Sequence, residues 1–194
     1  SLRSGALDMV YGPIPAPMAL PLKDVPRMVV SACPQVSTIS GRFYFLVDRP
    51  PFNDVRVRRA LQMSMDREGM VKAILLGQGV TAPHYPNEVD RTYVKWDELP
   101  PETAQWVKYD PKRAKQLLAE AGYPNGFDIG LKLSTGYRTP YPELSEAVMG
   151  FFREIGIRAK PRFVTAIEWA HFSNTGDFGD DGLAFGQIAS LPGP

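Results

Sequence analysis

Strand-like and helix-like segments alternate along the second half of the chain, and this order limits the fold more than any other feature. Residues 129–133 alternate apolar and polar side chains, as a strand with one buried face does. Other segments repeat their apolar residues at the spacing of a helix turn. Strands are expected at 129–133, 157–164 and 182–188, and helices at 110–122, 142–155 and 167–172. Strands that alternate with helices indicate an α/β layer fold with a largely parallel or mixed sheet flanked by helices.

The segment that begins at residue 42 predicts a strand, a turn and two consecutive helices. Aromatic and β-branched residues at 42–47 favour a strand, which Pro50–Pro51 ends. Asn53 is expected to cap the first helix, and Asp66 the second, which closes at Gly77. The apolar face of the first helix is expected to contain Val57, Ala60, Leu61, Ser64 and Met65.

Two other stretches lack a regular pattern. Prolines recur between residues 13 and 26, and since proline has a fixed φ and no N–H, this connector is predicted to be extended and not helical. A short strand is expected at 28–30. Residues 78–109 are rich in Pro, Asp, Tyr and Trp and are predicted to form a long irregular loop.

Charge and cysteine content exclude several classes of site. The 22 Lys and Arg balance 21 Asp and Glu to a net charge of +1, which gives no reason to expect a nucleic acid as partner. Cys33 is the only cysteine, so neither an intrachain disulfide nor a Cys-based zinc site can form. His84 and His171 lack acidic neighbours at ligand spacing, and the acidic run 177–181 is interpreted as solvated loop. We therefore expect no metal and no cofactor. The first residues show no signal-peptide pattern, and no apolar run approaches the roughly 18 residues that span a bilayer.

Two motif-like patterns have simpler structural interpretations. Gly77–Ala82 fits G-x-G-x-x-A, but it follows a helix and precedes Pro83, so a helix C-cap is favoured over a dinucleotide loop. The arginines at 56, 58 and 59 and the two consecutive helices suggest a helix-turn-helix, but the second helix offers few polar residues to a groove. A solvated helix face with i,i+4 pairing is favoured for these arginines.

The loop Gly136–Tyr141 has the chemistry best suited to a ligand. It follows the carboxyl end of a predicted strand and precedes a helix, which is where open α/β sheets bind ligands. Arg138 offers a planar set of donors for a carboxylate or phosphate, while Tyr137 and Tyr141 offer ring faces and hydroxyls. A surface loop with an arginine extended into solvent explains the same residues equally well. The residues alone leave both interpretations open.

Five segments of the chain, taken in order, form a recognisable set. They are Leu2–Asp8, Pro50–Leu61 with Met65–Arg67, Tyr109–Tyr123, Gly126–Phe127, and Phe152–Ile157. This set resembles the extracellular solute-binding proteins, family 5. That family comprises the periplasmic peptide-, oligosaccharide- and nickel-binding components of ABC importers.

The resemblance implies a fold, a location and partners. It implies a periplasmic-binding-protein-like lobe of type II, peptide-binding class, with no enzymatic activity. Residues 1–40 would be a crossover segment and proline-rich connector, and residues 41–194 a second ligand-binding lobe that lacks its C-terminal return. The partners would be the missing first lobe of the same protein, a membrane ABC permease and a peptide-like or other small polar solute, sugars and carboxylates included. The location would be periplasmic or on the extracellular face of the cytoplasmic membrane.

The resemblance also implies site residues by position. Arg138 lies where dipeptide-type members place an arginine for a ligand carboxylate, and Gln187 stands where members often have tryptophan. The ligand contacts implied in this way are Tyr44, Tyr137, Arg138, Phe185 and Gln187.

Ala189 and Ser190 stand where peptide binders often place an acidic residue for the ligand's ammonium group. Without that charge, a free peptide N-terminus would lose a charge-assisted hydrogen bond of about 1.5–3 kcal/mol. A sugar, an opine-like compound or a carboxylated solute is therefore as consistent with the sequence as a peptide.

Two interpretations of other classes stay open. The first is an α/β enzyme domain that binds a nucleotide or phosphorylated substrate through Arg138, which requires a phosphate-binding loop between a strand and a helix. No such loop is found in the sequence. The second is an independent interaction module that associates with itself through the surface that would face the missing lobe.

Overall fold

The computed structural model describes residues 9, 16–26, 28–30, 42–77, 81, 96–136 and 141–186. Within these residues the strands are β1 (Arg42–Phe45), β2 (Asp128–Ser134), β3 (Arg158–Val164) and β4 (Leu183–Gly186). The helices are α1 (Ala16–Ala19), α2 (Val55–Met63), α3 (Arg67–Ile74), α4 (Pro101–Val107), α5 (Pro111–Glu120), α6 (Tyr141–Glu154) and α7 (Ala166–Thr175), with short 3-10 turns η1 (Leu20–Leu22) and η2 (Trp96–Glu98).

The four strands form one mixed sheet in the order β1-β4-β2-β3. β2 runs parallel to both β3 and β4, whereas β1 runs antiparallel to β4. The last strand of the described chain is therefore inserted between the first strand and the second. This arrangement confirms the predicted α/β fold with a mixed sheet.

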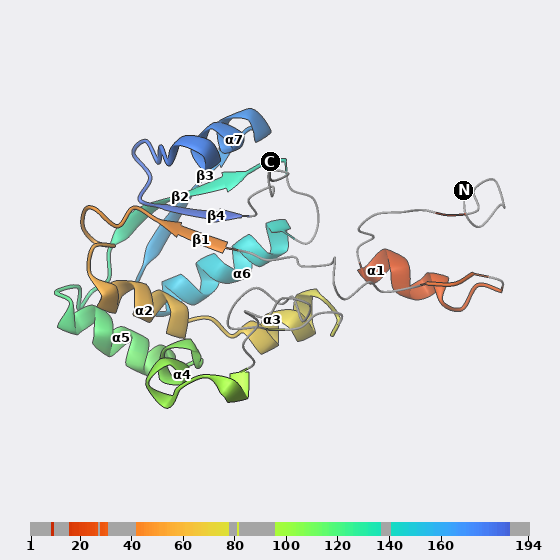
Figure 1. Ribbon diagram of the computed structural model, residues 1–194, viewed down its shortest axis with the longest axis horizontal. Coiled ribbons are helices and arrows are strands. Elements are labelled where there is room, and N and C mark those ends of the chain that lie inside the picture. The colour runs from red at the N-terminus through yellow and green to blue at the C-terminus, as the bar shows by residue number, and fades with distance from the viewer. Residues whose placement is uncertain are drawn as a thin grey trace.

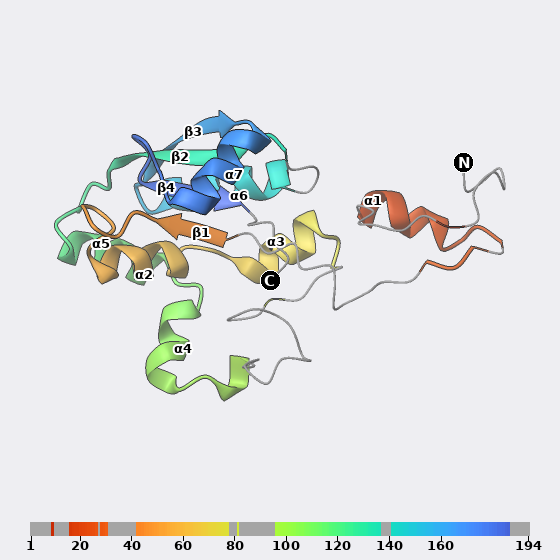
Figure 2. The same cartoon turned by 45° about the horizontal axis from the view of Figure 1, so that its top comes forward.

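Helices cover both faces of the sheet. α2, α5 and α6 lie on one side and α7 on the other, as Figures 1 and 2 show. The alternation of β2 explains this layering, because Leu131 and Leu133 point into the larger core under α6 while Lys132 points to the α7 side. The smaller core under α7 contains Trp169 and Phe172.

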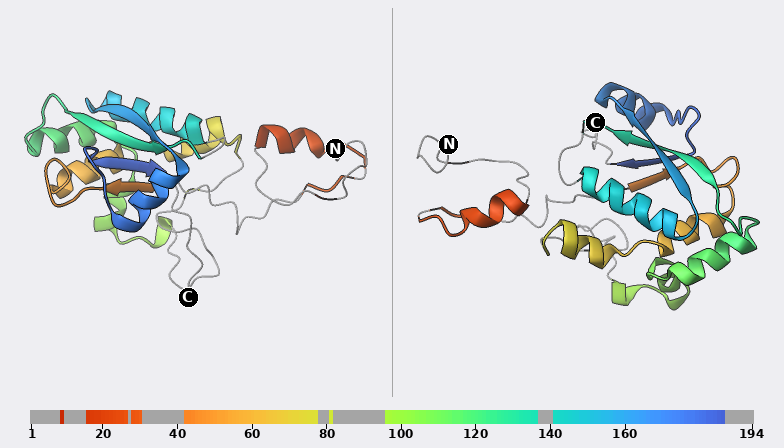
Figure 3. Two further views of the ribbon diagram at one scale, coloured as in Figure 1. Left: turned by 90° about the horizontal axis from the view of Figure 1, so that it is seen from above. Right: turned by 180° about the vertical axis from the view of Figure 1, so that it is seen from behind.

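The helices furthest from the sheet pack on α2. α5 lies against α2, and α4 contacts α2 on the side away from the sheet (Figure 2). α1 contacts η1, and both lie to one side of the α/β body in every view (Figure 3).

The two helices predicted after residue 50 are both present, with one difference at the first cap. Val57, Ala60 and Leu61 are buried on α2, as the helical spacing predicts. However, Asp54 and not Asn53 is the N-cap, and its side chain accepts a hydrogen bond from the Arg56 N–H at 2.8 Å. The reason is that the Asn53 N–H donates to the carbonyl of Arg49, so Asn53 belongs to the preceding turn.

The other predicted helix boundaries follow their capping residues. Asp66 accepts from the Gly69 N–H at 2.8 Å and Asp110 from the Arg113 N–H at 2.9 Å, and each carboxylate satisfies a backbone donor that the first helical turn leaves unpaired. At the start of α7, Thr165 and Glu168 form a reciprocal capping box. This helix continues to Thr175, beyond the expected end at residue 172.

Three predictions of local structure are wrong. The connector is not extended throughout, because residues 16–22 form α1 and η1; the fixed φ of proline suits the first turn of a helix, where no N–H partner is needed. Residues 28–30 form no strand. The expected irregular stretch 78–109 contains α4, where Trp106 packs at the margin of the larger core. Tertiary packing thus stabilises a short helix that its local sequence does not indicate.

Candidate functional site

The carboxyl ends of β2, β3 and β4 meet at one edge of the sheet, together with the amino end of β1. In the register of the strands, Ser134 lies opposite Val164, and Gly186 lies opposite Arg42. The chain leaves the sheet at this edge after β2 and β4, and it enters α6 there at Tyr141. Open α/β sheets bind ligands at the edge formed by the carboxyl ends of their parallel strands.

Backbone hydrogen bonds fix the end of β2 at this edge. The N–H of Thr135 donates to the carbonyl of Val164 at 2.8 Å, and its hydroxyl donates to the same carbonyl at 3.1 Å. The Ser134 hydroxyl accepts a hydrogen bond from the Gly136 N–H at 3.1 Å. The first residues after β2 are therefore held against β3.

A hollow of about 190 Å³ opens beside these residues, and we call it the carboxyl-edge hollow. Phe185 and Leu133 lie at its base, with 5% and 3% of their surfaces exposed, whereas Phe163 is 64% exposed at its rim. The described residues that line it are Leu133, Ser134, Thr135, Tyr141, Pro142, Ser145, Phe163 and Phe185.

Tyr141 is the titratable group of this hollow. The pKa of its phenol is raised to about 12, first by burial and then by the nearby Tyr44, while Arg42 acts to lower it. The phenol is therefore neutral near pH 7, and a guanidinium group lies close enough to influence it. The edge combines apolar rings with one nearby cation.

The predicted site residues occupy different faces or different segments. Phe185 lies in the carboxyl-edge hollow and packs on Phe43, with 4.8 Å between the ring centroids and the ring planes tilted by 33°. Tyr44 pairs with Ala184 on the other face of the sheet, where its ring meets Phe172 edge-on at 5.8 Å. The sheet therefore does not bring the rings of Tyr44 and Phe185 together.

The other three predicted contacts lie outside the described residues. Tyr137 and Arg138 belong to the segment 137–140 between β2 and α6, and Gln187 follows β4. Both segments join the described chain at the carboxyl edge. Ala189, Ser190, Cys33 and His84 also fall outside the described residues.

Sequence reasoning missed Phe163, whereas it named Tyr141 as a candidate but placed it in the wrong element. Phe163 is an aromatic residue on the strand 158–164 and, unlike the other rings of the hollow, it is largely exposed. Tyr141 was expected in the loop, but it begins α6 and is 9% exposed. Only the strand-end position of Phe163 in the sequence hinted at a place near the ligand edge.

A second hollow, of about 430 Å³, lies on the α7 side of the sheet and is bordered by charged residues whose bonds are internal. Lys132 donates to the carbonyl of Asp177 at 3.0 Å and lies 4.9 Å from the centre of the Phe172 ring. Burial, followed by the nearby Arg162, lowers the Lys132 pKa. Arg162 donates to Asp181 at 2.6 Å. The described residues that line this hollow are Lys132, Arg162, Val164, Ile167, Glu168, His171, Asp177 and Gly179.

The expectation that the whole acidic run 177–181 is solvated is therefore wrong for Asp181. This residue is 5% exposed, and its carboxylate pairs with Arg162 of β3. A buried carboxylate needs such a partner, and the partner comes from a strand distant in sequence.

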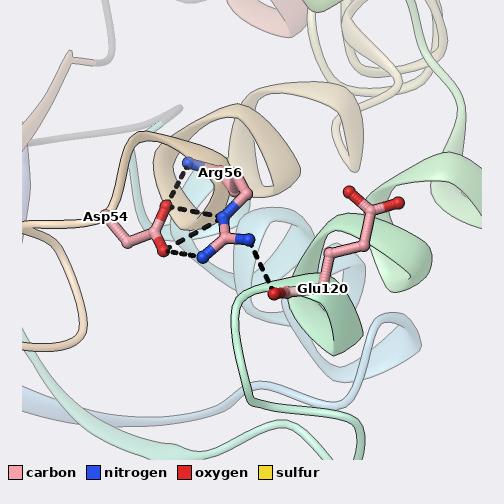
Figure 4. A network of polar contacts seen from close by, with 3 residues as sticks. All are labelled: Asp54, Arg56 and Glu120. Carbon is pink, nitrogen blue, oxygen red and sulfur yellow. Dashed lines mark hydrogen bonds and ion pairs between the residues drawn. The ribbon is translucent and has the colours of Figure 1, made fainter.

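The arginines of α2 hold neighbouring elements together, and the expected i,i+4 pairing is wrong. Arg56 pairs with its own helix cap, Asp54, at 2.6 Å and donates to the carbonyl of Glu120 at 2.7 Å, as Figure 4 shows. Arg58 donates to the carbonyl of Phe52. Arg59 lies 4.1 Å from the centre of the Trp106 ring, which joins α2 to α4. These side chains take part in packing and do not form the site.

Gly77 behaves as the sequence indicates. It follows α3 with a φ of +74°, a conformation that glycine adopts at helix ends. In the part of the chain that the structure describes, no group of three or more His, Cys, Asp or Glu could hold a metal ion. No helix among the same residues is long and apolar enough to cross a membrane.

A mixed α/β sheet with helices on both faces and an uncharged hollow at its carboxyl edge defines a ligand-binding α/β lobe. The comparison with known families names the lobe more closely. The chain belongs to the bacterial extracellular solute-binding proteins, family 5, whose middle region matches residues 1–184.

Relatives of known name have the same character. "Heme-binding protein A" of Haemophilus influenzae is 31% identical over 175 residues, which cover 88% of this chain and 29% of that protein. "Dipeptide-binding protein" of Escherichia coli is 29% identical over 135 residues, which cover 68% of this chain and 23% of that protein. The chain thus spans less than a third of the length of these relatives.

Solved structures agree with the fold. The dipeptide binding protein from Pseudoalteromonas sp. SM9913 in complex with Met-Leu superposes with a TM-score of 0.61 at 26% identity, over 79% of this chain and 29% of that one. The oligopeptide-binding protein AppA from Bacillus subtilis gives a TM-score of 0.61 at 25% identity, over 75% of this chain and 30% of that one. The chain therefore has the fold of a lobe of the peptide-binding class of periplasmic binding proteins.

Proposed function

We propose that this chain is one lobe of the solute-binding component of an ABC importer, located in the periplasm or on the outer face of the cytoplasmic membrane. Membership of family 5 is the observation that carries the proposal. The lobe binds its solute without chemical conversion and hands it to a membrane permease. Nucleic acid is not among its partners, in agreement with the net charge of +1.

The proposed domain division follows the family pattern. Residues 1–40 form the crossover segment and connector, and residues 41–194 form the second lobe without its C-terminal return. The proposed boundary near residue 41 is supported by the sheet, whose first described strand begins at Arg42. The first lobe of the complete protein supplies the other side of the cleft, and hinge closure encloses the solute.

The solute lies at the carboxyl edge of the sheet in this proposal. Arg138, Tyr137 and Gln187 belong to segments that join the chain at this edge, and Phe185 lies in the carboxyl-edge hollow. Arg138 binds a carboxylate of the solute through paired hydrogen bonds. Tyr44 is the weakest of the proposed contacts, because its ring packs with Trp169 and Phe172 under α7.

The family leaves the solute open, because relatives differ in what their names say they bind. One relative is named for heme and another for dipeptides. A peptide-like compound or another small polar solute, such as a sugar or a carboxylate, fits the proposal. The permease is proposed on family grounds alone.

Isothermal titration calorimetry tests the proposal in two arms. The protein that contains both lobes is expected to bind a small solute, whereas the 194-residue chain alone is expected to show little affinity, since a half-site leaves the solute exposed. Micromolar binding by the isolated chain would contradict the two-lobed mechanism.

The matched variant is Arg138→Ala in the two-lobed protein, and Arg158→Ala is its control. Arg158 is an exposed arginine that pairs with Asp128, and it lies at the end of β3 opposite the carboxyl edge. Loss of a charged hydrogen bond is expected to weaken carboxylate binding roughly 10- to 100-fold. Unchanged affinity would remove Arg138 from the site. Tight binding of ATP in the same titration would instead favour the enzyme interpretation.

A further inference from the structure

The carboxyl-edge hollow differs from its surroundings in having no charged side chain among the described residues that line it. Elsewhere on the sheet, β3 carries Arg158, Lys160 and Arg162. The larger hollow on the α7 side contains both cations and carboxylates. The described lining itself therefore offers no ion-pair partner to a charged group, although Arg42 lies near enough to act on the Tyr141 phenol.

Three hydroxyls that line the hollow, those of Ser134, Thr135 and Ser145, already bond to the protein backbone. Ser145 donates to the Tyr141 carbonyl at 2.8 Å, and Thr135 donates to the Val164 carbonyl at 3.1 Å. Ser134 accepts from the Gly136 N–H. A polar group that entered the hollow would lose water and find few partners, which disfavours it relative to an apolar group.

The aromatic residues of the hollow favour an apolar occupant. Phe185 closes the base, and Phe163 presents an exposed ring at the rim that would lose contact with water if it were covered. The volume of about 190 Å³ is below the roughly 300–1,000 Å³ of pockets that enclose a whole drug-sized ligand. The hollow therefore accepts one side-chain-sized group and not an entire solute.

We propose that the carboxyl-edge hollow is the subsite for one compact apolar or aromatic group of the transported solute, and that Phe163 and Phe185 determine this specificity. The inference rests on the proposed function, because it assumes that the solute binds at this edge. It narrows the solute to compounds with an uncharged apolar substituent. Unsubstituted sugars and small dicarboxylates are then poor ligands.

Calorimetry on the two-lobed protein tests the inference with a matched panel of solutes. The panel contains Gly-Leu, Gly-Phe, Gly-Asp, Gly-Lys and Gly-Gly, the same dipeptides in reversed order, maltose and glutarate. We expect the Leu or Phe compounds to bind at least roughly tenfold more tightly than the Gly, Asp and Lys compounds.

Phe163→Ala is the decisive variant, and Ile167→Ala is its control. Both side chains are exposed, at 64% and 83%, so neither change threatens the fold, but Ile167 does not line the carboxyl-edge hollow. Phe163→Ala is expected to reduce the preference for Leu or Phe over Gly roughly tenfold and to change Gly-Gly affinity little. Ile167→Ala is expected to leave the preference unchanged. Phe163→Asp places a charge at the rim and is expected to shift the preference toward Gly-Lys.

Each remaining outcome overturns a specific statement. A wild type that binds none of the panel refutes the proposed peptide-like, sugar or carboxylate solute, and the apolar subsite with it. A wild type that binds but prefers maltose, glutarate or a charged dipeptide leaves the proposed function standing and refutes the apolar subsite. If Phe163→Ala weakens every ligand equally, the hollow receives the opposite lobe on closure, and the specificity role is wrong.

Discussion

The turns that precede β2 and β3 meet back to back at Gly126 and Gly156. Gly126 has a φ of +68°, and a Cβ built on it would lie 2.9 Å from the Cα of Gly156 and closer still to the Gly156 carbonyl. The Arg158 N–H donates to the carbonyl of Phe127 at 2.8 Å, so this contact sets where the two strands begin to pair. Gly126→Ala is therefore expected to destabilise the sheet strongly.

Gly122 offers a matched control for the magnitude. Its φ is +94°, but a Cβ there would meet no atom within 4 Å. An L-residue held at positive φ costs about 1–2 kcal/mol, which is the whole loss expected for Gly122→Ala. At Gly126 the same cost applies, and relief of the overlap with rigid backbone adds about 1–3 kcal/mol. The two variants should differ in free energy of unfolding by about 2 kcal/mol.

Urea unfolding of the chain, followed by tryptophan fluorescence and circular dichroism, measures this difference. With a slope of about 2 kcal/mol/M, the midpoint should fall by roughly 0.5–1 M for Gly122→Ala and by roughly 1–2.5 M for Gly126→Ala. Equal losses would show that backbone conformation alone decides the cost. That result would refute the argument from the contact between the two turns.

Two further variants test the charged contacts. Asp181→Ala is expected to lower the free energy of unfolding by roughly 1–3 kcal/mol in the same urea titration, because Asp181 is 5% exposed and accepts a hydrogen bond from Arg162. Asp180 is exposed, so Asp180→Ala should change the free energy of unfolding by less than about 0.5 kcal/mol. Similar losses at both positions would contradict the structural role of the Asp181–Arg162 pair. Glu168→Gln is expected to flatten the acid limb of the stability–pH profile. Hydrogen bonds from Thr165 lower the Glu168 pKa from 4.5, so the folded state favours the ionised carboxylate. The ionised carboxylate therefore stabilises the fold above pH 4.5, and this stabilisation is lost as the pH falls through the lowered pKa. An acid limb as steep as that of the wild type would argue against this contribution.

Local sequence predicted most of the helices and strands. The caps at Asp66 and Asp110 and the alternation in 129–133 act over a few residues. The structure confirms both caps and the strand, although it also buries Lys132 on the second face of that strand. The same patterns predicted the α/β fold with a largely parallel or mixed sheet. The alternation of strands and helices limits the fold, because each strand must pair with a strand that lies beyond a helix in the sequence.

Tertiary structure alone decided which residues share a face. Phe185 and Tyr44 are on different strands, and only the pairing of Tyr44 with Ala184 shows that their rings lie on opposite sides of the sheet. Likewise, Asp181 is buried only because β3 brings Arg162 to it. Strand order and register arise from contacts between residues far apart in the chain, which local propensities and caps do not encode. The sequence determined the elements and the family, whereas long-range pairing decided which side chains form the hollow.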